Sequence, residues 1–120
     1  MNYSPETIAD LSSLTRVQVE TLKTHLAVNN DQINMQDALK SRKISGISRG
    51  AYYRILAQAR KNMKKSLFTV ATAAQLGLIK PEDVQKLISM VTLIPNEVDP
   101  EKLPEILGLV NAVADRIVML

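Results

Sequence analysis

The sequence predicts an all-α protein in which a helix-turn-helix bundle precedes a C-terminal helical oligomerisation region. Apolar residues recur every three or four positions in successive segments. Pro, Gly, Asn and Asp stand where those segments end, and no segment alternates apolar and polar residues as a strand does. The predicted division is a helix-turn-helix DNA-binding domain at 1–66 and an apolar helical region, which mediates dimerisation, at 67–120.

The first predicted helices are short. Pro5 follows the capping residue Ser4, which predicts a helix over 5–13. Thr15 is expected to cap a second helix over 16–28. A third short helix is expected near 34–42. The apolar positions expected to face inward on the second helix are Val17, Val19, Leu22, Leu26 and Ala27.

The next helix has the strongest pattern. Ser48 is a good N-cap, and the helix beginning at Arg49 is expected to continue to Gly77, a common type of C-terminal stop. Its inner stripe repeats at spacings of three and four residues. The members of that stripe are Tyr52, Ile55, Leu56, Ala59 and Met63.

Two further helices are expected in the last third of the chain. Pro81 predicts the start of a helix, and the acids in the next two positions interact favourably with the dipole at that end of the helix. Pro104 stands at the expected start of the last helix, which is apolar on more than one face. A helix of that kind must be buried, so self-association through residues 67–120 is predicted. One compact monomer and a different protein partner remain alternatives.

Charge is distributed unevenly along the 120 residues. Residues 1–66 carry a net charge of +6 and residues 67–120 carry −3. Residues 40–65 hold nine Lys or Arg and no acid, whereas solvated helices normally alternate charges. The pattern favours contact with a nucleic acid over a plain solvated face or an acidic protein partner.

Two stretches carry a resemblance to a known family. LTRVQVETL at 14–22 and ISRGAYYRILAQARKNMKK at 47–65 resemble the fourth region of bacterial sigma factors and related response-regulator helix-turn-helix domains. The matching residues are Leu14, Thr15, Val19, Leu22, Ile47, Ser48, Arg49, Ile55, Ala59 and the basic tail at 60–65. The resemblance implies duplex-DNA binding in transcription. The sequence departs from the pattern at Gly50 and Ala51, where polar side chains often read bases.

The recognition helix is predicted at about 48–65. Arg49 and Arg54 are the candidates for bidentate contact with guanine, and Tyr53 for contact with a thymine methyl, sugar or phosphate. The other candidates are expected to contact the phosphate backbone. These are Arg16, Lys40, Arg42, Lys43, Ser48, Lys61, Lys64 and Lys65.

Other chemistry has little support in the sequence. The single histidine, His25, and the absence of Cys give no metal-ligand set, so a structural role is expected for His25. No nucleophile stands with a base, and no phosphate loop is present, so neither an enzyme nor a cofactor is expected. No signal peptide or membrane span is expected either, and the predicted location is cytoplasmic and nucleoid-associated.

The sequence therefore favours a homodimeric, sequence-specific transcriptional regulator. A symmetric dimer suits this function because it presents two recognition helices to successive turns of the major groove. The alternative is an architectural, partition or assembly protein that binds duplex DNA with little sequence preference and oligomerises through its C-terminal helices. RNA binding is less favoured because the chain has only four Phe, Tyr and Trp residues for stacking.

Overall fold

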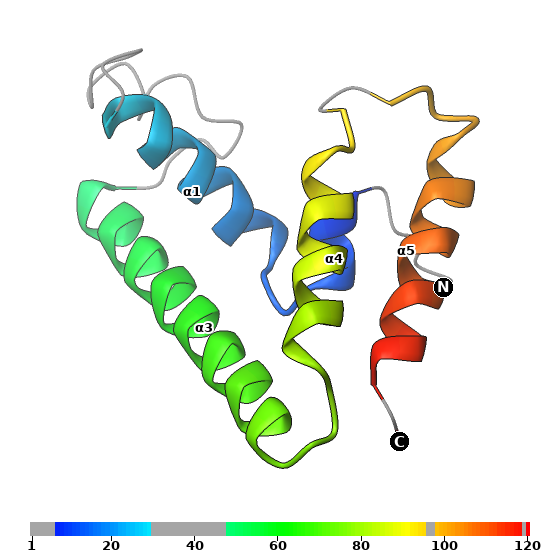
Figure 1. Ribbon diagram of the computed structural model, residues 1–120. Coiled ribbons are helices and arrows are strands. Elements are labelled where there is room, and N and C mark those ends of the chain that lie inside the picture. The colour runs from blue at the N-terminus through cyan, green and yellow to red at the C-terminus, as the bar shows by residue number, and fades with distance from the viewer. Residues whose placement is uncertain (1–6, 30–47, 96–97, 119) are drawn as a thin grey trace, which may run out of the picture. The chain divides into compact units, whose positions relative to one another are not determined.

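A computed structural model of the chain describes residues 7–29, 48–95, 98–118 and 120 (Figure 1). Every regular element in these ranges is helical, which confirms the all-α prediction. The elements are the 3-10 helix η1 and four α-helices. Their bounds are η1 Ile8–Leu11, α1 Arg16–Asn29, α3 Arg49–Gln75, α4 Pro81–Thr92 and α5 Leu103–Ile117.

The described residues fall into two compact units. One lies within 13–65 and contains α1 and the first part of α3. The other combines residues 7–12 with the chain from 66 onward, including the end of α3, α4 and α5. The domains predicted at 1–66 and 67–120 stay a prediction, and the third helix expected near 34–42 lies outside the described residues.

Within the described part, the N-terminal helix expected over 5–13 is shorter than predicted and is the 3-10 helix η1. The Ser12 backbone N–H and hydroxyl both donate to the Ala9 carbonyl, at 3.0 and 2.6 Å. The Thr7 N–H donates to Asp10 Oδ2 at 3.1 Å. Bonds that span three residues tighten the chain into one 3-10 turn, which Ser12 ends in extended conformation.

α1 begins as predicted but buries different residues. Thr15 caps it, since the Gln18 N–H donates to Thr15 Oγ1 at 3.1 Å and the Thr15 N–H donates to Gln18 Oε1 at 3.1 Å. The fully buried residue is Thr21, whose hydroxyl donates to the Val17 carbonyl at 2.8 Å. Val17 and Leu26 were expected to face inward, but both are exposed, Leu26 to 60%. The helix therefore packs on a stripe that contains polar residues, which an apolar pattern does not reveal.

α3 has the predicted ends. Ser48 Oγ accepts the Ala51 N–H at 3.1 Å, which caps the start. At the other end, the Leu78 N–H donates to the Ala73 carbonyl and the Gly77 N–H to the Ala74 carbonyl, as in a Schellman motif. Gly77 adopts a φ of 79°, a left-handed conformation that Gly takes without steric cost.

α4 and α5 pack against each other in the second unit. Pro81 and Pro104 stand in the first turns of these helices, as predicted. The buried apolar residues of this unit are Ile79, Leu107, Val110 and Ile117. No described helix combines the length and the apolar character needed to cross a bilayer.

Candidate nucleic-acid interface

The first half of α3 is fixed against α1 through Tyr52, which is fully buried as predicted. Its hydroxyl lies 3.4 Å from His25 Nδ1, and the two ring centroids are 6.4 Å apart. The ring of Tyr53 meets that of Tyr52 edge-on, with centroids 5.3 Å apart and an interplanar angle of 86°. Tyr53 itself is exposed. Tyr52 therefore packs the helix against α1, and Tyr53 contacts Tyr52 while remaining exposed to solvent.

A second contact lies near the start of α1. The Asn62 side-chain amide donates to the Ser13 carbonyl at 2.7 Å and lies 3.4 Å from Gln18 Oε1. The Ser13 hydroxyl donates to Asn62 Oδ1 at 3.2 Å. Residue numbers rise along α1 as they fall along α3, so the two helices are antiparallel.

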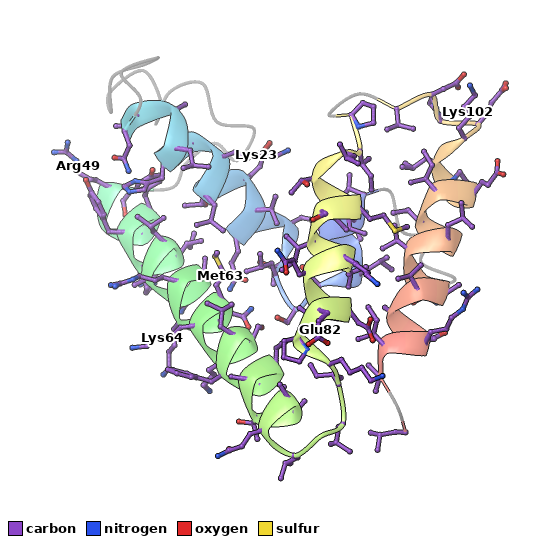
Figure 2. All side chains as sticks on the ribbon, viewed as in Figure 1. Lys23, Arg49, Met63, Lys64, Glu82 and Lys102 are labelled. Carbon is purple, nitrogen blue, oxygen red and sulfur yellow. The ribbon has the colours of Figure 1, made fainter. Side chains whose placement is uncertain are left out.

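This register places Thr21 of α1 level with Ala59 of α3, and both are completely buried. Small side chains at a helix contact let the two helices lie close together. Met63 was expected in the inner stripe, and its side chain does lie on the side of α3 that faces α1 (Figure 2). It is nonetheless 46% exposed, because α1 begins at Arg16 and offers no helical turn to cover it. That part of the predicted stripe is wrong.

The outward side of α3 carries only positive charge. The helix has six Lys or Arg and no Asp or Glu among its 27 residues, and its first turn contains no acid. Arg49 and Lys64 project from the side of the helix that faces away from α1 (Figure 2). A cation at a helix N-terminus opposes the helix dipole, so Arg49 gains nothing from its own helix.

Helical periodicity places the exposed cations of residues 49–65, together with Tyr53, in two lines along α3. At about 100° per residue, the first basic row contains Arg49, Tyr53, Arg60 and Lys64. The second basic row contains Arg54, Lys61 and Lys65. Between the two rows lies a floor of small residues.

The floor consists of Gly50 and Ala57, both of which are exposed. A Cβ added at Gly50 would meet only Ser48 Oγ, at 3.9 Å. The outer surface of the helix is therefore low along its middle and basic on both sides. The surface is therefore complementary in charge to a ligand that carries two lines of anions.

The remaining candidate residues are placed differently. Ser48 is exposed, but its Oγ already accepts the capping bond. Arg16 is exposed on α1, about 140° round that helix from the buried Thr21, so it is not brought to the basic face of α3. Lys40, Arg42 and Lys43 lie outside the described residues.

The sequence interpretation overlooked Thr21, Gln18 and Asn62, which help to position the basic helix. Only its position in the sequence could have indicated such a role for Asn62, which stands three residues after Ala59 and therefore near the inner stripe. It also overlooked Arg60 as part of the first basic row. Within the described ranges, no group of three or more metal-binding side chains comes together.

Comparison with known proteins adds no assignment. No protein-family model matches the sequence, and no match emerges among curated proteins or solved structures.

Proposed function

We propose that this chain binds duplex DNA as a sequence-specific, homodimeric transcriptional regulator whose recognition helix spans about residues 48–65. The observation that carries the proposal is the arrangement of the two basic rows on either side of the small floor of α3. When the helix enters a major groove, we expect each row to contact the phosphates of one strand. Neutralising phosphates releases counterions, which supplies much of the affinity of DNA-binding proteins.

The rigid mounting of this helix supports the same function. Tyr52, Ala59 and Asn62 tie it to α1 along most of its length. A recognition helix must be held at a defined angle so that a few side chains reach base edges. Arg54, in the second basic row, is the candidate for reading guanine, and Lys64, in the first, for contacting phosphate.

A second candidate function is favoured by the floor itself. Gly50 and Ala57 bring the backbone close to a groove but offer no hydrogen-bonding side chain. A protein with such a helix could hold many sequences almost equally well, as an architectural, partition or assembly protein does. The two functions differ in how strongly the binding affinity depends on the sequence of the duplex.

Binding titrations of two variants separate these functions. We expect Arg54→Ala to lower the preference for a selected duplex over random duplex by about 1–3 kcal/mol. Lys64→Ala is expected to weaken both duplexes about equally and to reduce the salt slope by about 1. Equal losses for both variants on both duplexes would favour the architectural function. No binding of the unaltered chain at low salt would contradict both functions.

A further inference from the structure

The second half of α3 changes character while its helix continues without interruption (Figure 1). The second basic row of Arg54, Lys61 and Lys65 leads at spacings of three and four residues to Phe68, Thr72 and Leu76. We call these last three residues the pairing row. Phe68 is 62% exposed and Leu76, directly after the helix, is 68% exposed.

The pairing row borders an open groove. Its lining residues are Phe68, Thr69, Thr72, Ala73, Leu76 and Leu78. Large apolar side chains stand at both ends, and small ones lie between them. The same surface therefore offers both the projecting side chains and the hollow that would receive them, which is the requirement for an isologous contact across a two-fold axis.

We propose that a second copy of this chain pairs along this row when both copies bind one duplex, with the two α3 helices crossing at Thr72. This inference extends the proposed function, on which its DNA component rests. Small residues at the crossing allow close approach, and Phe68 of one copy enters the groove of the other. Toward the N-terminal end of α3, the positive charges of Lys61 and Arg54 in the two copies would repel each other. The helices must therefore diverge toward their basic halves.

The size of the row explains why DNA takes part in the pairing. A patch of this length supplies on the order of 400 Å², about half of the ~800 Å² that each partner contributes to a stable complex. Free chains would therefore pair weakly. Binding two copies to neighbouring half-sites raises their effective concentration, so pairing appears as cooperative binding to DNA.

The helix length sets the spacing of the half-sites. Ala57, in the middle of the basic half, lies 15 residues from Thr72. At 1.5 Å per residue this is about 22 Å, so the two basic halves are at most about 45 Å apart. Half-sites one helical turn apart, at about 34 Å, are within reach, whereas two turns, at about 68 Å, are not.

The test uses the full chain, duplexes with two half-sites about 10, 15 or 20 base pairs apart, and two matched variants. We expect cooperative binding only at the one-turn spacing. Phe68→Asp should abolish the cooperativity, whereas its affinity for a single half-site should stay within about threefold of that of Leu67→Asp, because each change adds one carboxylate three residues after a lysine of a basic row. Leu67→Asp is the control, since Leu67 is 70% exposed but lies about 100° round the helix from Phe68.

The natural absence of Cys allows a second readout. Thr72→Cys should form a disulfide-linked dimer on the one-turn duplex under mild oxidation, whereas Gln85→Cys on α4 should not. DNA binding that is non-cooperative at every spacing, or equal loss with Phe68→Asp and Leu67→Asp, would overturn the pairing but leave the proposed function standing. Absence of DNA binding would overturn the proposed function. In that case, a Thr72→Cys cross-link at a chain concentration of about 1 mM without DNA would still support the pairing row, and its absence at that concentration, where even weak pairing is populated, would overturn it.

Discussion

The two halves of α3 meet opposite requirements on one continuous helix. In residues 49–65, Tyr52 and Ala59 are fully buried against α1, and cations occupy the outer side. In residues 66–75, large apolar side chains such as Leu67 and Phe68 are exposed, and charge is absent. The first half packs within its own chain and presents cations to solvent. The second half presents apolar side chains to solvent, and we propose that a second copy of the chain covers them.

The two halves should differ most in how much stability is lost when one aromatic ring is removed from each. Tyr52→Ala should lower the free energy of unfolding by about 3–5 kcal/mol, because it leaves a cavity between α1 and α3. Phe68→Ala should change it by no more than about 0.5 kcal/mol in the free chain, because the ring is already exposed. Chemical denaturation followed by circular dichroism measures both values.

Tyr53→Ala serves as the control for Tyr52→Ala because it removes the same ring from the same helix at an exposed position. Its effect on unfolding should also stay near 0.5 kcal/mol or below. Equal destabilisation by the changes at Tyr52, Tyr53 and Phe68 would show that burial does not distinguish the two halves as described.

The second prediction adds volume at the α1–α3 contact. Ala59→Leu should destabilise the protein by about 1–3 kcal/mol, because Ala59 has no exposed surface and lies level with the buried Thr21. Ala57→Leu introduces the same side chain on the exposed floor and should be nearly neutral for stability. Thermal unfolding of the two variants makes the comparison, and similar melting temperatures would contradict the close approach of the helices.

The fold was largely predictable because its signals are local. The Ser48 cap, the glycine stop at Gly77 and the proline starts at Pro81 and Pro104 each follow from backbone chemistry within one turn. The inner face of α1 was not predictable in the same way. Thr21 is buried because its hydroxyl bonds to the carbonyl of its own helix, and apolar periodicity does not detect a polar residue satisfied in this manner.

A third, smaller effect is expected at the polar contact near the start of α1. Asn62→Ala should cost about 1 kcal/mol, because it removes the donor to the Ser13 carbonyl and the contact with Gln18. Met63→Ala, its neighbour, should cost less, since much of that side chain is already in solvent. Urea denaturation of the two variants ranks them. A greater loss for Met63→Ala would restore the inner stripe that the sequence alone predicts.

The smallest effect on stability is expected at the floor. Gly50→Ala should raise stability by about 0.5 kcal/mol, because alanine favours the helix and the added methyl meets no backbone. The same change should weaken DNA binding if the floor lies against the groove. DNA titration and thermal unfolding of one variant test both effects. Unchanged DNA affinity would indicate that the duplex does not approach this side of α3.

The candidate site was predictable in composition but not in arrangement. A run without acids predicts a surface for a polyanion, which stays a prediction. The cations Arg49, Arg54, Lys61 and Lys64 are exposed. The division into two basic rows depends on which side of α3 meets α1, and polar contacts at His25 and Asn62 help to set that side. Arg16, which the sequence predicts to contact phosphate beside the groove, is exposed on α1 rather than on α3, and its contact stays a prediction.

The most direct measurement for the central claim is the salt dependence of binding between the full chain and duplex DNA. The described part of α3 presents six cations. If about half or more of them contact phosphates, log K should fall linearly with log salt concentration with a slope of about −3 to −5. No binding at low salt, or an affinity that salt leaves unchanged, would contradict the assignment of this helix to DNA.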